Sequence, residues 1–256
     1  MVLTAPWHDE PMADDVRSWL GEQVRSRVAG PDASTRRAVL LDTDEPGWFD
    51  DDAPIRRVHA DSSMFIGGLR AILFQSLHPL AMAGVADHSD YRRDPWGRLQ
   101  RTADFLAATT FGPASQAQQA VDRVHRVHRH VVGTGPHGEP YSANDPHLLE
   151  WVHLAEIDSF LAAHDRYGEQ RLSGADRDRY VADTAVVARA LGVIDPPETE
   201  ARLRSRLAEF RPELRGTKPA RSAARYLLLQ PPLPLAARAP YALIAGAAVA
   251  LLPAWT

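Results

Sequence analysis

The sequence predicts an all-α protein, and three observations support this fold class. Apolar residues recur at three- and four-residue steps through most of the chain, which is the period of an amphipathic helix. No segment shows the sustained two-residue alternation of a half-buried strand. Helix start signals and glycines separate the periodic segments. One all-α domain over residues 1–256 is the simplest organisation for this length and composition.

The periodic segments define the expected elements in order. They predict helices near residues 12–28, 61–76, 79–87, 95–110, 114–131, 145–166, 175–191, 197–210, 217–229 and 235–251. Local signals support several of these boundaries. Pro113 and Pro146 suit the first turn of a helix, and Gly133, Gly168 and Gly192 follow helices, as C-terminal glycines do.

Two polar segments interrupt the helical pattern. Residues 29–60 are rich in Asp, Pro and Arg, so we expect a loop with at most a short helix. Residues 133–143 contain three glycines and two prolines, and we expect a second loop there. Because these glycines lie between helices rather than after a strand, they do not form a dinucleotide-binding motif.

Composition excludes several classes of protein. The chain has no cysteine, which removes disulfides, iron–sulfur clusters, thiolate-ligated haem and covalent c-type haem. Any metal must therefore be held by His, Asp, Glu, Tyr, Met or Lys. The formal net charge of −4 argues against a nucleic-acid binder.

The two ends of the chain predict its location. Residues 1–15 are acidic and lack the apolar core of a signal peptide, so we expect a cytoplasmic protein. Residues 239–253 form an apolar run that is shorter than the ~20 residues needed to span a bilayer. We expect a buried terminal helix there. The alternatives are a helix in peripheral contact with a membrane, or one that lines an opening for an apolar substrate.

Histidines on buried helix faces are the main candidates for a functional site. Val121, Val124, His125 and His128 fall on one face of the helix predicted at 114–131. A buried histidine must satisfy two ring nitrogens, and a metal together with a carbonyl group does this well. A hydrogen bond to a neighbouring helix is the alternative. His130 falls on the other face, where we expect it to be solvated.

The helix predicted at 145–166 is apolar nearly all round, which is typical of a central helix. His153 should therefore lie deep in the fold, where ligation and a structural hydrogen bond are equally compatible with the pattern. Near the predicted helix at 79–87, His78 precedes a proline. We expect it at a helix break, where it caps a helix or lines a pocket.

An arginine and a threonine share a face of the helix predicted at 95–110. Arg98 and Thr102 are four residues apart. A guanidinium donates two parallel hydrogen bonds and a hydroxyl a third, so the pair can hold a carboxylate or phosphate. An ordinary exposed arginine is the alternative reading.

An ordered series of motifs carries a family resemblance. The series is HP-x3-AGVADHS, DPWGRLQRT, FG, VHRHVVG and GEPYSANDPHLLEWVH. It resembles the haem-dependent oxygenase family that contains latex-clearing protein (a rubber oxygenase) and the fungal oxygenase MpaB. The motifs cover roughly residues 60–165. The resemblance implies a globin-like helical fold around a b-type haem that cleaves a C=C bond of an isoprenoid substrate with dioxygen.

The resemblance also implies roles for individual residues. His128 matches the proximal iron ligand, and Arg98 and Thr102 match the residues beside the haem. His153 is a further candidate for contact with the cofactor. Arg101 stands where latex-clearing protein has a lysine that can ligate the distal side, and a guanidinium is a poor iron ligand. The acidic residue proposed as the family's catalytic base does not align securely, and Asp87 is a spatial candidate for that role.

Two other functions remain open from the sequence. Asp122-x-x-His125 and Glu150-x-x-His153 have the carboxylate–histidine spacing of di-iron helical bundles, which predicts a non-haem iron enzyme. A helical binding protein that has lost its cofactor is the other. Neither the substrate nor the oligomeric state follows from the sequence.

Overall fold

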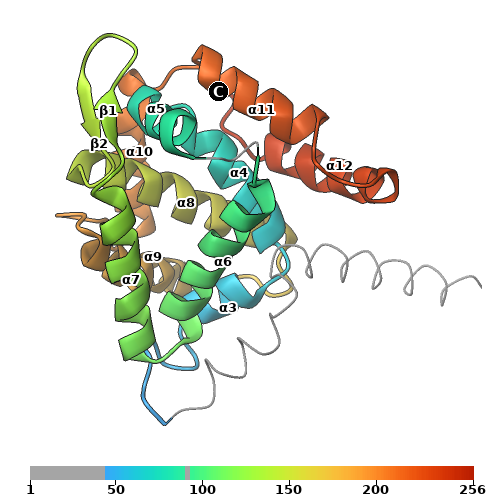
Figure 1. Ribbon diagram of the computed structural model, residues 1–256. Helices are drawn as coiled ribbons and strands as arrows, with labels where there is room; N and C mark the ends of the chain where they lie inside the picture. The colour runs from blue at the N-terminus through green and yellow to red at the C-terminus, as the bar shows by residue number, and fades with distance from the viewer. Residues whose placement is uncertain (1–43, 90–92) are drawn as a thin grey trace, which may run out of the picture.

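The computed structural model describes residues 44–89 and 93–256, and it confirms the all-α prediction (Figure 1). Helices in the first part of the described chain are α3 (Pro54–Ala60), α4 (Met64–Gln75), α5 (Pro79–His88), α6 (Pro95–Phe111) and α7 (Ala114–His128). They are followed by α8 (Pro146–Tyr167), α9 (Gly174–Leu191), α10 (Glu200–Phe210), the 3-10 helix η1 (Arg211–Glu213), α11 (Lys218–Leu229) and α12 (Leu235–Ala250). The helix predicted near 12–28 lies outside the described residues.

Local capping explains several helix boundaries. The Asp94 carboxylate accepts a hydrogen bond from the Gly97 N–H at 2.9 Å, and α6 begins with Pro95. Asp145 caps α8 in the same way, accepting from the His147 N–H at 2.8 Å. These side chains satisfy N–H groups that have no partner inside the helix. Gly192 ends α9 with a φ of 103°, a conformation that favours glycine.

A β-hairpin corrects the prediction for residues 131–143. Helix α7 ends at His128, and the expected loop forms β1 (Val132–Thr134) and β2 (Pro140–Ser142), which are antiparallel. Gly133 pairs with Tyr141 inside this hairpin and does not end a helix. The strands are only three residues long, so they are too short to produce a recognisable alternation in the sequence.

Helix α8 forms the centre of the molecule, as its all-round apolar surface predicts (Figure 1). Trp151 and Leu154 are completely buried, and Phe74 of α4 and Phe210 at the end of α10 pack against the same cluster. The Trp151 indole N–H donates to the Gln75 carbonyl oxygen at 3.0 Å, which satisfies its polar atom. Because α8 is packed by α4, α9 and α10, its side chains are held on a rigid element.

Helix α12 is less buried than the sequence predicts. Ala245 and Ala248 pack toward α4, while Leu235 and Leu243 on its other face are 80% and 78% exposed. The expectation of a buried terminal helix is therefore wrong for this face. No single helix in the described ranges is long and apolar enough to cross a membrane. Helices α4 and α5 are long and apolar enough only when taken together, and this pair is bent by 104°.

Candidate functional site

Helices α6 and α7 bring Arg98 and His128 to the same end of the molecule. The helices pack together and are joined by Gly112 and Pro113 alone, so they run in opposite directions. Arg98 and His128 stand nearly the same number of residues from this connection. At 1.5 Å per residue, both are about 21–22 Å along their helices from it. The helices diverge toward this end, and α8 is seen between them (Figure 1).

His128 has a carbonyl neighbour and lies at the end of its helix. Its side chain is half-buried, and both burial and the nearby His125 lower its pKa, while a backbone hydrogen bond at Ala143 opposes this shift. The ring is therefore neutral at pH 7, with one nitrogen directed at the backbone. A histidine whose one ring N–H is held by a carbonyl presents its other nitrogen as a ligand, the usual arrangement in metal proteins.

Hydrogen bonds join α5 to α6 and to the hairpin at this end of the molecule. Arg98 donates from Nη1 to the Ser89 hydroxyl just after α5. The Tyr141 hydroxyl donates to Asp87 Oδ2 at 2.8 Å, and burial together with Asp87 raises the pKa of Tyr141 to about 12. Asp87 is thus attached to β2 through Tyr141, His128 to the residue after β2, and Arg98 to the end of α5. Asp87 itself is exposed and is already engaged by Tyr141.

Thr102 and Arg101 face outward on α6. The Thr102 hydroxyl donates to the Arg98 carbonyl oxygen of its own helix at 3.2 Å, and its side chain is exposed. The Arg101 side chain is 68% exposed and lies 3.3 Å from Asp94 Oδ2. Neither side chain points to an enclosed space in this arrangement.

Three of the four candidate di-iron ligands are engaged elsewhere. His125 Nε2 donates to the Ala190 carbonyl oxygen at 3.0 Å, which ties α7 to the end of α9. Asp122 is exposed and accepts from Gln118. Glu150 accepts two hydrogen bonds of 2.7 Å from Arg206. The carboxylate–histidine spacing therefore does not converge on a shared metal within the described residues.

A group of polar side chains lies inside the fold and was not found from the sequence, apart from His153. His59 of α3, His153 and Glu156 of α8, and Tyr180 of α9 belong to this interior polar group. The Nε2 atoms of both histidines and the Tyr180 hydroxyl are buried without a hydrogen-bond partner among the described residues. The His59 ring packs edge-on against the Tyr180 ring, with the two ring centroids 6.0 Å apart. Glu156 interacts electrostatically with Tyr180.

Burial sets the charge state of this interior polar group. It lowers the pKa of both His59 and His153 to about 3, so both rings are neutral. It also raises the pKa of Glu156 to about 7. A buried polar atom without a partner costs about 1–3 kcal/mol unless a ligand or water satisfies it. Glu156 follows His153 by three residues on the same helix face, and this spacing is the one sequence signal for the group.

A second cluster joins three distant parts of the chain. The His78 side chain caps α5, and its Nε2 atom lies 3.2 Å from Glu213 Oε2 of η1. The Nε2 atom of His147, in the first turn of α8, lies 2.9 Å from the same oxygen. The capping role expected for His78 is confirmed, since its Nδ1 accepts from the Ala81 N–H. His147 and Glu213 carry no recognisable pattern in the sequence.

Comparison with known proteins identifies the family. The sequence profile described as "ER-bound oxygenase mpaB/B'/Rubber oxygenase, catalytic domain" matches residues 56–256. Searches of the curated proteins and of the solved structures gave no match. The match extends well beyond the motif-bearing region, through the helices that follow α8, and covers most of the chain. The protein therefore belongs to the mpaB/rubber oxygenase family and is an oxygenase, an oxidoreductase.

Proposed function

We propose that this oxygenase binds a b-type haem through His128 and uses dioxygen to oxidise or cleave a C=C bond of an apolar, isoprenoid-like substrate. The observation that carries the proposal is the His128 ring, which is neutral, half-buried and held at the backbone of Ala143. Its position in the VHRHVVG motif corresponds to the proximal ligand of the family that the chain resembles.

The residues present fit a haem. Its two propionates need cationic or hydrogen-bonding partners, and Arg98 lies at the same level of the α6–α7 pair as His128. Arg98 is half-buried and donates to Ser89, so its guanidinium is already oriented by the fold. A charged hydrogen bond of this kind orients a carboxylate as well as binding it. When bound, haem supplies the redox chemistry with dioxygen.

The interior polar group supports an enclosed ligand. His59, His153 and Tyr180 have buried polar atoms without a partner among residues 44–89 and 93–256, and these atoms come from three different helices. Leu99 and Phe105 of α6 are only half-buried, as expected where an apolar molecule would complete the packing. With a pKa of about 7, Glu156 is able to hold or release a proton on its carboxyl oxygen near neutral pH.

Arg101 distinguishes this chain from latex-clearing protein on the side opposite the proximal histidine. A lysine there is able to lose its proton and coordinate iron, whereas a guanidinium keeps its proton. Arg101 is also exposed and paired with Asp94. We propose that this position supplies no side-chain ligand to the iron of a bound haem, which would leave the iron accessible to dioxygen.

The haem proposal is tested by absorption spectroscopy of the full-length protein, produced with iron and a haem precursor. We expect a Soret band and about one haem per chain. His128→Ala should lose the haem, whereas His130→Ala should retain it, because His130 is exposed two residues away. A normal Soret band and stoichiometry in His128→Ala would contradict the assignment.

The substrate proposal is tested by reducing the haem-loaded protein and adding dioxygen with a panel of short isoprenoids. We expect carbonyl products detectable by mass spectrometry, dependent on dioxygen. If haem-loaded protein returns every isoprenoid unchanged, the substrate class is wrong while the haem assignment stands. The cytoplasmic location stays a prediction, and the family description itself names an ER-bound oxygenase.

A further inference from the structure

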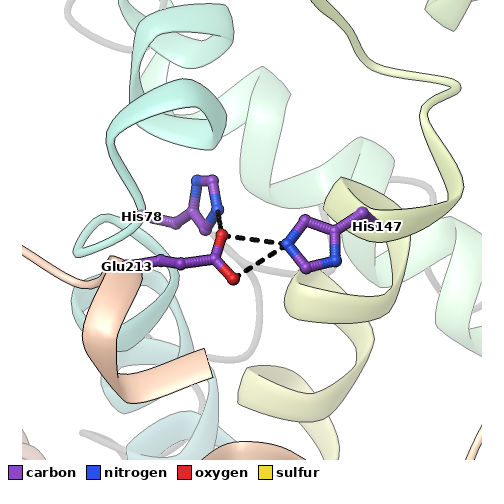
Figure 2. Close-up of side chains that lie close together, drawn as sticks. All are labelled: His78, His147 and Glu213. Atoms are coloured by element: carbon purple, nitrogen blue, oxygen red, sulfur yellow. Dashed lines mark hydrogen bonds and ion pairs between the residues drawn. The ribbon is translucent and has the colours of Figure 1, made fainter. Parts of the chain in front are cut away.

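His78, His147 and Glu213 form a compact group of three donors, which we call the His–His–Glu cluster. One ligand atom from each residue lies within 4.8 Å of the other two. Figure 2 shows that both imidazole rings point a nitrogen at the same carboxylate. Within the described residues, this is the one group of at least three His, Asp or Glu side chains with such convergence.

The cluster does not belong to the proposed haem site. His78 precedes α5 and His147 opens α8, whereas Asp87 lies at the far end of α5. The His78 ring instead packs at a tilt against Trp151 of the core, with the two ring centroids 6.2 Å apart. None of the three residues has a role in the oxygenase proposal.

The distances in the cluster are close to those of a metal site. The His78 Nε2–Glu213 Oε2 and His147 Nε2–Glu213 Oε2 distances are 3.2 and 2.9 Å. Around a tetrahedral ion with bonds of about 2.0–2.1 Å, neighbouring ligand atoms are about 3.4 Å apart. Both His–Glu distances are therefore within a few tenths of an ångström of this value, and all three ligand atoms lie within 4.8 Å of one another.

His78 is a rigidly held ligand of the cluster, whereas His147 and Glu213 leave the cluster open to solvent on one side. The His78 side chain is 4% exposed, and α5 and α8 hold the backbones of the two histidines. The side chains of His147 and Glu213 are 51% and 42% exposed, so solvent reaches the cluster. His147 also lines a surface hollow with Asp145 and Arg206. Two imidazoles and a carboxylate with an open side are typical of catalytic zinc and non-haem iron sites.

We propose that His78, His147 and Glu213 bind one divalent transition-metal ion of the zinc class, separate from any haem, with solvent at the remaining position. Binding through His78 Nε2 requires the proton to move to Nδ1. That nitrogen now accepts a weak hydrogen bond from the Ala81 N–H at 3.5 Å, and this bond and the Nε2–H bond to Glu213 would both be given up when the ion binds. The ion would join η1 to the starts of α5 and α8.

The test uses zinc alone as the probe and the full-length protein after treatment with a chelator. Equilibrium dialysis with elemental analysis should give about one zinc per chain, with iron measured in the same samples. Zinc should also raise the melting temperature, because an ion that binds only the folded state stabilises it. Retention of haem and uptake of zinc are separate readouts, so each proposal can fail alone.

Variants assign the ligands. His147→Ala and Glu213→Gln should each weaken zinc binding by at least about tenfold. Glu213→Gln keeps the shape of the side chain, which separates ligation from packing. His137→Ala is the matched control, since His137 is exposed on the hairpin and outside the cluster. No zinc uptake by the unmodified protein, or uptake that survives either ligand substitution, overturns the proposal in favour of a purely hydrogen-bonded cluster.

Discussion

Gly67 of α4 lies directly against Phe160 of α8, with no room for a side chain between the two helices. A Cβ atom placed on Gly67 would lie 3.0 Å from Phe160 Cδ1 and 3.1 Å from its Cα. The next residue, Gly68, has nothing within 4 Å of the same position. The close approach of α4 positions α8, the helix that carries His153 and Glu156.

This relationship predicts opposite effects of two adjacent substitutions. Gly67→Ala should lower the free energy of unfolding by about 1–2 kcal/mol, because the backbone of α8 cannot yield as a flexible side chain would. Gly68→Ala should raise it by about 0.5–1 kcal/mol, because alanine restricts the unfolded chain and favours the helix. Urea unfolding followed by circular dichroism measures both. Equal effects of the two substitutions would contradict the packing described.

The Arg206–Glu150 pair should be important for stability. Its two hydrogen bonds of 2.7 Å join α10 to α8, and the Glu150 side chain is only 10% exposed. Arg206→Ala should therefore cost about 2–3 kcal/mol, because it leaves a nearly buried carboxylate unpaired. Arg204→Ala is the control on the same helix. Its side chain is 67% exposed and pairs with Glu200, so the loss should stay below about 1 kcal/mol.

Glu156 should make stability depend on pH. Burial raises its pKa from 4.5 to about 7, so the folded state keeps this proton over a range in which the unfolded state loses it. The group's contribution to stability is complete below about pH 4.5 and is lost as the pH rises through 7. The shift corresponds to at most ~3 kcal/mol.

Glu156→Gln should remove this dependence. Denaturation at pH 5, 6, 7 and 8 should show the variant gaining on the unmodified protein as the pH rises, with the difference levelling off above pH 7. Glu169→Gln, at an exposed position after α8, is the control and should leave the slope unchanged. Parallel pH profiles for Glu156→Gln and the unmodified protein would show that this carboxyl is not buried as described.

Arg98 should contribute to haem retention if the proposed function is correct. A charged hydrogen bond to a propionate is worth about 1.5–3 kcal/mol, and partial exposure reduces this, so Arg98→Ala should weaken haem binding about tenfold. Haem transfer to apomyoglobin measures the loss rate. Arg126→Ala, at an exposed position on α7, is the control. An unchanged transfer rate in Arg98→Ala would remove this residue from the cofactor site.

The sequence by itself determined the helices, because a helix is built from contacts within four residues. Caps such as Asp94 and Asp145 and the all-round apolar surface of α8 can be recognised without knowing what packs against them. The motifs also identified the oxygenase family, which the profile match to residues 56–256 confirms. His78 was expected at a helix break for the same local reason, either as a cap or in a pocket, and the structure shows the cap.

Only the tertiary structure decided which side chains meet. Glu150 and His153 have the spacing of di-iron ligands in the sequence, yet the Glu150 carboxylate pairs with Arg206, 56 residues away. Glu213 meets His78 across 135 residues and His147 across 66, and no local pattern encodes these contacts. The raised pKa of Glu156 likewise comes from burial by several helices. Helix positions follow from short-range hydrogen bonding, whereas ion pairs, metal ligands and pKa shifts depend on how finished helices pack.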